Sequence, residues 1–413
     1  MFSIRGQMDP TGTAIDWENG ARWTRVTVGA GAVSTGRQPQ HSDACPSLSC
    51  FGACKSPHTT DALRGLLSDV TIGCAEFTNG EVGIIRGPCA QPVCKEGEVV
   101  RERECKDANA TRGHWDVFGF RVKLVTGLLQ EAVPSCPGTR LALIDLTDYD
   151  PRHHGRFFRN ATAMHELGRN CAASLTWEAE GEVPRGRAPL PEQPIMIPDA
   201  YFLMTRGYHR TSKYFEKAGV DETKEAIARN NLESPWASKH FSVVWRGTDT
   251  SDVSGDRKRL VERAAELRKE GRFSKAQLDI FFSEKFFQSG DNRSYLTIPQ
   301  MIESRGIVSV DGIGNEWTLV WKLMSNSVVL LVESRRVWQW YFPQMLPWKH
   351  YVPVRNDLSD LKDSVQFVLD PANDAKLTAI AQASTELALS LEMKTEARLL
   401  RNRLAGSFRC PRR

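Results

Sequence analysis

Apolar and polar residues form a regular pattern mainly in the later part of the chain. From about residue 115 onward, short continuous apolar runs alternate with longer stretches in which apolar residues recur at helical spacing. Short continuous runs are typical of strands buried on both faces, as in parallel sheets. The pattern therefore predicts α/β layers with largely parallel sheets between about residues 115 and 405.

Six apolar runs are the predicted strands, at residues 141–144, 194–199, 241–245, 307–310, 328–332 and 350–354. Helical spacing predicts helices at residues 117–133, 257–272 and 317–324, and one long helix after Asp370. Asp370 is the predicted N-cap of this last helix, with Pro371 at its first position. Because ligands bind outside the carboxyl ends of parallel strands, the polar residues that follow the strands are the candidate site.

The first 110 residues are rich in Gly, Ser, Thr, Pro and Cys and show no sustained period. The remainder is too long for one doubly wound sheet and has no eightfold repeat, so two Rossmann-like halves are the preferred architecture. We expect four parts, namely a Cys-rich irregular segment (1–110), a first Rossmann-like domain (111–235), a second Rossmann-like domain (236–370) and a C-terminal helix with a tail (371–413).

Charge and hydropathy exclude several partners. The 413 residues carry 54 basic and 50 acidic side chains, a net charge of +4, so no strong field favours nucleic acid. Apolar runs such as 327–332 are far shorter than the ~20 residues of a membrane helix. The N-terminus lacks the apolar run of a signal peptide, and we expect a signal or anchor to be missing from it.

Cysteine usage favours an oxidising compartment. Seven of the ten cysteines lie between Cys45 and Cys105, and Asn-x-Ser/Thr sequons begin at Asn109, Asn160 and Asn292. These features predict the lumen of the secretory pathway. The alternative, a zinc site at the cysteines from residue 45 to 54, lacks paired CxxC spacing and a histidine pair, so we expect no metal.

An acidic cluster follows the first predicted strand. Asp148 at this position could act as a general base facing a cleft. Alternatively, Asp145, Asp148 and Asp150 only end the strand and cap the next element. A third possibility is that Asp148 and Asp150, in an acid-x-acid pattern, hold a divalent ion together with a nucleotide sugar.

Two glycine-bearing turns follow later strands. In the first, Gly247 permits close backbone approach, and the hydroxyl of Thr248 and nearby amides could bind phosphate. Arg257, at the start of the next helix, could pair with a diphosphate, helped by the helix N-terminus. The second turn, residues 311–316, enters a helix. Each turn is either a phosphate site or an ordinary surface or packing turn. The aromatic run 337–342 is expected to pack between the halves rather than to stack on nucleic acid.

Several of these motifs together carry a family resemblance. The stretch 341–361, YFPQMLPWKHYVPVRNDLSDL, resembles glycosyltransferase family 90, as do the DGIG turn at 311–314 and the SNSVVL strand at 325–330. This family contains protein O-glucosyltransferases, capsule xylosyltransferases and bacterial lipopolysaccharide-modifying relatives. The WRGT sequence at 245–248 and Arg257 match further family elements. The resemblance spans about residues 115 to 400 and is most specific in the last third.

The resemblance implies a GT-B-like fold, with two Rossmann-like domains facing across a cleft, and a metal-independent, inverting reaction without a cofactor. It implies that Asp148 deprotonates an acceptor hydroxyl on a protein or glycan, which then attacks glucose or xylose carried by UDP. The residues expected to hold the UDP-sugar are Arg246, Gly247, Thr248, Arg257, Gly312, Gly314, Asn315, Glu316 and Thr318.

The chain departs from the animal members of this family at two of these positions. Thr318 stands where they have an arginine, and Glu316 stands where they have a serine. These departures motivate an alternative, a non-catalytic glycan- or nucleotide-binding protein that retains the fold. The chain also ends in Cys410-Pro411-Arg412-Arg413 rather than a KDEL-like sequence, so a Golgi location is at least as well supported as the endoplasmic reticulum.

Overall fold

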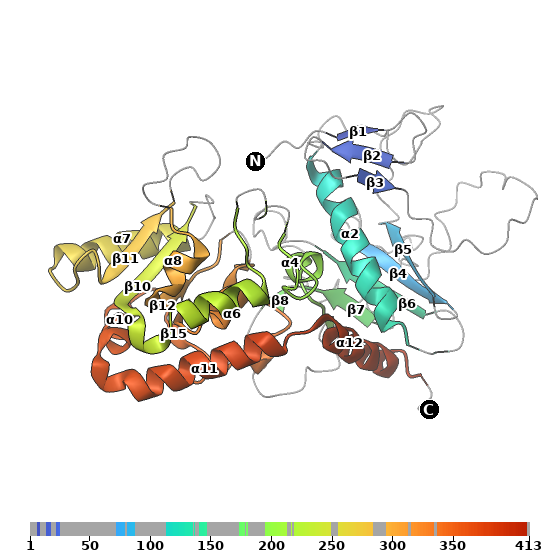
Figure 1. Cartoon of the computed structure of the whole chain (residues 1–413). Helices are drawn as coiled ribbons and strands as arrows, with labels where there is room; N and C mark the ends of the chain where they lie inside the picture. Colours follow the sequence, from blue (N-terminus) through green and yellow to red (C-terminus); the bar gives the residue numbers. More distant parts are fainter. Residues whose placement is uncertain are drawn as a thin grey trace, which may run out of the picture.

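A computed structural model describes most of the later part of the chain and short pieces of the first part. The described residues are 6–8, 14–17, 22–24, 72–78, 81–86, 113–134, 136, 140–146, 173–177, 179–180, 195–212, 216, 219–248, 255–283, 295–312, 315–333 and 337–410. They form a mixed α/β structure with two five-stranded sheets, shown side by side in Figure 1. A small antiparallel sheet comprises β1 (Gly6–Met8), β2 (Ala14–Trp17) and β3 (Arg22–Thr24).

The first five-stranded sheet is mixed, with the strand order β5-β4-β6-β7-β9. Its strands are β4 (Ile72–Thr78), β5 (Glu81–Arg86), β6 (Arg140–Asp145), β7 (Ala173–Thr176) and β9 (Ile195–Met196). Strands β5, β4 and β6 pair antiparallel, whereas β6, β7 and β9 pair parallel. The segment expected to be irregular, residues 1–110, therefore contributes two strands to this sheet, besides the three strands of the small antiparallel sheet. The dipeptide Asn79-Gly80 between β4 and β5 is a strong hairpin signal that composition alone obscures.

The second sheet is entirely parallel, with the strand order β11-β10-β12-β13-β15. Its strands are β10 (His240–Gly247), β11 (Leu278–Phe282), β12 (Ser304–Ser309), β13 (Val328–Val332) and β15 (Val352–Val354). Successive residues of β13 face two different apolar cores: Val329 joins the core shared with the first sheet, and Leu330 joins the core under α7 and α10. Burial on both faces explains the continuous apolar runs in the sequence.

The helices connect and cover these strands. The longer ones are α2 (Gly113–Ala132), α6 (Lys224–Glu233), α7 (Asp256–Lys269), α10 (Leu361–Leu369), α11 (Asp374–Ser390) and α12 (Met393–Ser407). The shorter ones are α4 (Ala200–Met204), α8 (Ile298–Ile302) and α9 (Leu319–Met324). Helix α6 packs against α8 and α9, so this part of the expected first domain lies with the second sheet. Within the described residues, no helix is long and apolar enough to cross a membrane.

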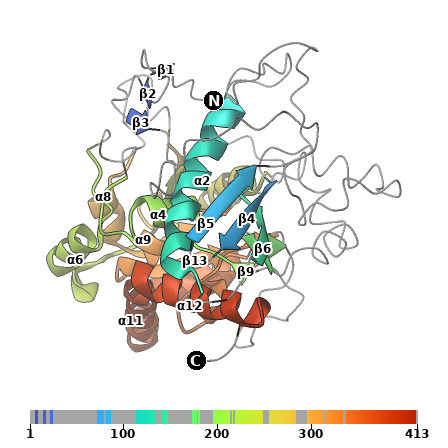
Figure 2. The same ribbon diagram turned by 90° about the vertical axis from the view of Figure 1, so that its right-hand side faces the viewer.

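The expected single C-terminal helix is two helices, and the side chain of Asp370 caps only a short turn, residues 371–373, that precedes them. Helix α11 packs on α9 and β13 of the second sheet, whereas α12 returns to α2 beside the first sheet (Figures 1 and 2). A disulfide between Cys136 and Cys410 joins the segment after α2 to the end of the chain.

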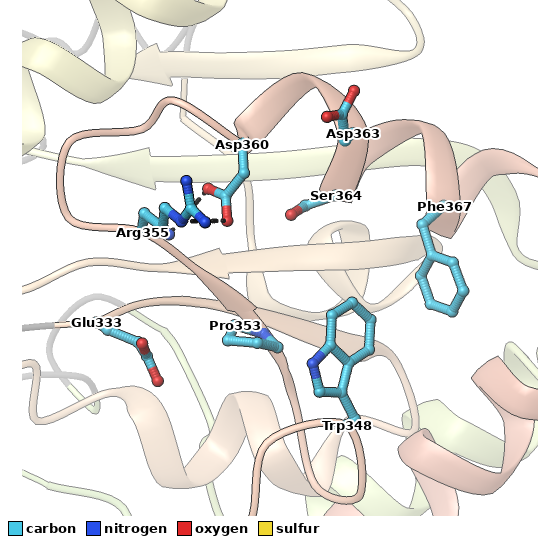
Figure 3. Close-up of a pocket in the computed structure, with 8 residues that line it drawn as sticks. All are labelled: Glu333, Trp348, Pro353, Arg355, Asp360, Asp363, Ser364 and Phe367. Atoms are coloured by element: carbon cyan, nitrogen blue, oxygen red, sulfur yellow. Dashed lines mark hydrogen bonds and ion pairs between the residues drawn. The ribbon is translucent and has the colours of Figure 1, made fainter.

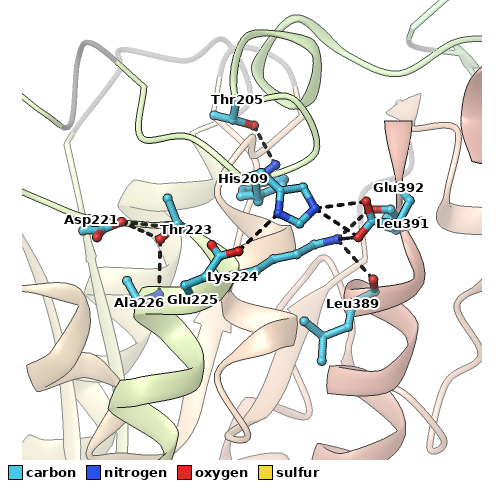
Figure 4. Close-up of polar contacts among 11 residues, drawn as sticks. Thr205, His209, Asp221, Thr223, Lys224, Glu225, Ala226, Leu389, Leu391 and Glu392 are labelled. Atoms are coloured by element: carbon cyan, nitrogen blue, oxygen red, sulfur yellow. Dashed lines mark hydrogen bonds and ion pairs between the residues drawn. The ribbon is translucent and has the colours of Figure 1, made fainter. Parts of the chain in front are cut away.

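Side chains distant in sequence hold the junction between α11 and α12 (Figure 4). The ammonium group of Lys224 donates to the carbonyl oxygens of Leu389 at 3.1 Å and Leu391 at 2.9 Å, and it pairs with the carboxylate of Glu392. The ring of His209 contacts the same carboxylate, with its Nε2 3.0 Å from an oxygen of Glu392, and its Nδ1 lies 3.3 Å from the carboxylate of Glu225. The Lys224 cation therefore binds carbonyl groups at the helix break, which the local sequence does not reveal.

Candidate functional site

Two of the expected turns meet at the carboxyl edge of the second sheet. Strands β10 and β12 are parallel neighbours, so Thr248 after β10 and Asp311 after β12 follow adjacent strand ends. The guanidinium group of Arg257, in the first turn of α7, joins them: its Nε donates to the carbonyl oxygen of Asp311 at 3.2 Å, and its Nη1 donates to that of Thr248 at 3.1 Å. The structure thus joins Thr248 and the turn 311–316 through the side chain of Arg257, all of which the sequence placed in the candidate site.

Arg246 has a different environment. Its guanidinium group makes two hydrogen bonds to the carboxylate of Asp279 on β11, at 2.9 and 2.8 Å, and a third to the carbonyl oxygen of the same residue at 2.7 Å. The group also lies 5.4 Å from the ring centre of Phe281. These contacts fix β10 to β11, and we therefore expect Arg246 to support the sheet rather than to contact a ligand.

Gly247 is required by a neighbour within its own strand. A Cβ atom added at this position would lie 2.5 Å from Cζ2 of Trp245, because the indole ring folds over the glycine. Trp245 itself is buried, at 1% exposure, in the core under α7. The group that approaches Gly247 closely in this structure is thus an aromatic side chain.

The carboxylate of Glu316 faces inward from the second turn. It accepts hydrogen bonds from the Lys322 ammonium at 2.6 Å and the Thr318 hydroxyl at 2.8 Å, and it contacts the Ser309 hydroxyl. Burial would raise the pKa of Glu316, but the positive charges of Lys322 and Arg257 lower that pKa below its usual value. The two positions at which the chain departs from the animal family members are therefore linked to each other and to a buried lysine.

The other residues of this turn are placed only in part. Gly312 and Asn315 are buried, and the carboxylate of Asp311 accepts a hydrogen bond from the backbone N–H of Glu316 at 3.1 Å, which holds the turn closed. Gly314 lies outside the described residues. Asp311 and Glu316 are both buried.

The candidate base, Asp148, also lies outside the described residues. Strand β6 ends at Asp145, and the carbonyl oxygen of Leu146 accepts a hydrogen bond from the buried guanidinium of Arg121 at 2.7 Å. This guanidinium lies 5.0 Å from the ring centre of Trp177. The chain is therefore anchored up to two residues before the candidate base.

A buried polar seam, which the sequence analysis missed, lies close to the second turn. The carboxylate of Asp199 caps α4 and accepts a hydrogen bond from the side-chain amide of Gln339 at 3.0 Å, and the hydroxyl of Tyr208 donates to the carbonyl oxygen of Trp317 at 3.1 Å. Burial and the charges of Asp199, Glu316 and Asp311 raise the pKa of Tyr341, which lies in this seam. The aromatic run 337–342 thus packs between the sheets as expected, for example with the rings of Trp340 and Phe202 5.1 Å apart.

Comparisons with known proteins agree with the resemblance inferred from the sequence. Residues 195–397 match the model of the family described as glycosyl transferase family 90. This match covers the second sheet, its helices and both turns of the candidate site, and it confirms the family to which the motifs of this region belong.

Curated relatives match parts of this chain. Protein O-glucosyltransferase 2 of Danio rerio is 30% identical over 180 residues, which are 42% of this chain and 34% of that protein. Protein O-glucosyltransferase 1 of Rattus norvegicus is 24% identical over 170 residues, 41% of this chain and 42% of that protein. A third relative, uncharacterized protein 035R of Invertebrate iridescent virus 3, is 42% identical over 84 residues, 20% of this chain and 8% of that protein. The chain therefore matches less than half the length of each of these relatives.

Proposed function

We propose that this chain is an inverting O-glycosyltransferase that transfers glucose or xylose from a UDP-sugar to a hydroxyl group of a protein or glycan. The observation that carries the proposal is the position of Arg257, which links two loops at the carboxyl edge of a parallel sheet within the region that matches glycosyl transferase family 90. A cation at such an edge, in the first turn of a helix, is suited to a diphosphate.

In the proposed reaction Arg257 and the backbone of the turns bind the diphosphate of the donor. Asp148 accepts the proton of the acceptor hydroxyl, whose oxygen attacks the anomeric carbon from the face opposite the diphosphate. The bond between that carbon and the diphosphate oxygen breaks, and its electron pair leaves with UDP. Arg257 stabilises the negative charge that develops on the leaving oxygen. The base and the diphosphate site must face each other, so two facing domains in a GT-B arrangement are part of the proposal. Independence from metal is a further part of it.

The inward orientation of Glu316 bears on the two departures from the animal family members. Because Lys322 and Thr318 occupy its carboxylate, Glu316 is not directed at the diphosphate, and Arg257 is the cation proposed to bind there. Arg257→Ala should weaken UDP binding by about 1.5–3 kcal/mol, the value of hydrogen bonds to a charged group. Isothermal titration calorimetry measures this directly, and an unchanged UDP affinity would count against the proposed diphosphate site.

A screen for UDP release tests the whole proposal. The protein is incubated with UDP-glucose, UDP-xylose and other UDP-sugars, with and without protein and glycan acceptors, and free UDP is measured. Release that depends on an acceptor supports a transferase. Absence of release, with UDP still bound, supports the non-catalytic alternative, and loss of release on addition of EDTA supports the metal-dependent one with Asp148 and Asp150 as ligands.

Localisation in the secretory pathway is part of the same proposal. The cysteine-rich composition and the pairing of Cys136 with Cys410 favour an oxidising compartment. Peptide mass mapping of the unreduced protein from the secretory pathway should recover these two cysteines in one disulfide-linked peptide pair, and recovery of both as free thiols would contradict it.

A further inference from the structure

A concave site lies on the second sheet, lined by none of the residues of the two turns described above. It is a pocket of about 370 Å³ beside the edge strand β15, between the loop that precedes this strand and helix α10 (Figure 3). Glu333, which follows β13, and Arg355, which follows β15, bring it to the carboxyl edge of the sheet. A pocket of this volume is within the range of small-molecule sites.

The indole ring of Trp348 forms an exposed wall of this pocket. The side chain is 46% exposed, and its backbone has a φ of +63°, in a region that bulky residues rarely adopt. A tight turn enforces this conformation: the N–H of Trp348 donates to the carbonyl oxygen of Tyr351 at 2.7 Å, and the N–H of Leu346 donates to the ring of His350 at 2.9 Å. The strained turn therefore holds a large apolar ring partly in solvent, with its edge-to-face contact to the ring of Phe367, 5.4 Å between ring centres, on the pocket side.

Polar groups on α10 complete the pocket opposite the indole ring. Ser364 is 6% exposed and lines the pocket, yet its hydroxyl has no hydrogen-bond partner among the described residues. The carboxylate of Asp363 is exposed, and the described part of the chain offers it no partner. Asp360, by contrast, accepts a hydrogen bond from the backbone N–H of Arg355 at 2.9 Å. A hydroxyl and a carboxylate are thus available to a ligand.

The charged side chains that line the pocket restrict the class of ligand that it can bind. The lining contains three carboxylates, from Glu333, Asp360 and Asp363, and one cation, from Arg355, so an anionic ligand is repelled. A cationic ligand is disfavoured for a different reason, the positive charge of Lys376. The ammonium group of Lys376 lies 5.0 Å from the ring centre of Trp348 and 5.1 Å from that of Phe367, and this positive charge repels a cationic ligand but not a neutral one.

We propose that this pocket binds a neutral saccharide through an apolar face on Trp348 and through hydroxyl groups to Asp363 and Ser364. Sugar C–H groups are weakly positive and suit the negative face of an aromatic ring, while carboxylate and hydroxyl oxygens suit sugar hydroxyls. The role of the pocket rests on the proposed function: it holds a sugar residue of the acceptor, at the same sheet edge as the donor site. The binding itself does not depend on transfer.

Saturation-transfer-difference NMR and calorimetry on the full chain test the proposal, with glucose, xylose and N-acetylglucosamine as probes. At least one of these sugars should bind saturably. Trp348→Ala should weaken that binding by tenfold or more, Asp363→Asn several-fold, and Trp348→Phe should retain most of it because it keeps an aromatic face. Phe241→Ala, which removes an equally exposed ring (46%) elsewhere on the sheet, is the matched control and should leave binding unchanged.

The outcomes separate this proposal from the proposed function. Saccharide binding that Trp348→Ala abolishes supports the pocket even if the protein releases no UDP, and UDP affinity should be the same in this variant as in the wild type. Equal binding in the wild type and Trp348→Ala, or no saturable binding of any of the three sugars, would overturn it. Binding of a lysine-rich peptide that Asp363→Asn abolishes, without sugar binding, would overturn it in favour of a cationic ligand.

Discussion

The buried ion pair of Glu316 and Lys322 gives the most quantitative prediction. Glu316 is 9% exposed and Lys322 2% exposed, and their charged atoms lie 2.6 Å apart. Lys322 also donates to the carbonyl oxygen of Val308 at 2.9 Å, at the end of β12. Lys322→Met keeps a side chain of similar length but leaves the carboxylate buried without its cation. Removing one partner of a buried pair costs roughly 3–5 kcal/mol, so we expect a loss of this size in the free energy of unfolding.

A double-mutant cycle separates the pair from its surroundings. Glu316→Gln should also destabilise, because it leaves the ammonium group buried without a counter-charge. The double variant Glu316→Gln/Lys322→Met has no buried charge and should cost no more than either single change, so the coupling free energy should be at least as large as the larger single cost, roughly 3–5 kcal/mol. Lys258→Met is the matched control. Lys258 also pairs with a glutamate, Glu262, at 3.8 Å, but on the exposed face of α7, and its loss should cost less than about 1 kcal/mol.

Urea unfolding of the full chain, followed by tryptophan fluorescence and far-UV circular dichroism, measures these differences. Coincident transitions from the two probes justify a two-state comparison. If Lys322→Met unfolds with the same free energy as Lys258→Met, or if the costs of the single changes simply add in the double variant, the pair is not the buried element that holds the second turn. Glu316 would then be available for direct contact with a ligand.

Two further predictions concern pH and packing. Burial raises the pKa of Glu396 from an ordinary 4.5 to about 7, although the positive charge of Arg403 opposes this shift. The stability linked to its protonated form is therefore complete below about pH 4.5 and is lost as pH rises through about 7. At pH 8, Glu396→Gln should therefore have a higher Tm than the wild type, which corresponds to about 3 kcal/mol in the free energy of unfolding. At pH 4.5 the two proteins should have similar Tm values. Equal Tm values of variant and wild type at both pH values would refute this prediction. Gly247→Ala forces the indole of Trp245 to move and should lower the free energy of unfolding by about 1–3 kcal/mol. Gly127→Ala is the control, because Gly127 has open space around it in α2, and this change should be neutral or stabilising. Equal changes in Tm in the two variants would argue against the close contact between Gly247 and Trp245.

Local patterns predicted most of the second sheet. The apolar run 328–332 coincides with β13, and the runs near 241, 307 and 350 fall on β10, β12 and β15, because strands buried on both faces leave a continuous apolar signal. Strand β11 was missed, although its residues Leu278–Phe282 carry the same signal. The hairpin of β4 and β5 was missed because the surrounding composition suggested irregular structure.

The other features that the sequence did not predict depend on contacts between residues far apart in sequence. The break between α11 and α12 depends on Lys224, more than 160 residues earlier, which binds carbonyl groups at the junction. Arg246, which is expected at the donor site, pairs with Asp279 on β11, a partner that sequence spacing does not identify. The inward orientation of Glu316 likewise depends on Lys322 being buried. Helical and strand periods do not encode these pairings, which appear only when the strands are assembled.

The proposed reaction requires Asp148, which follows β6, and Arg257, in the first turn of α7, to act together in one transfer step. The most direct test measures acceptor-dependent UDP release and UDP affinity in Asp148→Asn. The account predicts that UDP release falls by about a hundredfold or more while UDP affinity stays nearly unchanged, because the base acts on the acceptor and not on the donor. Undiminished release from a donor that the wild type uses would contradict the account.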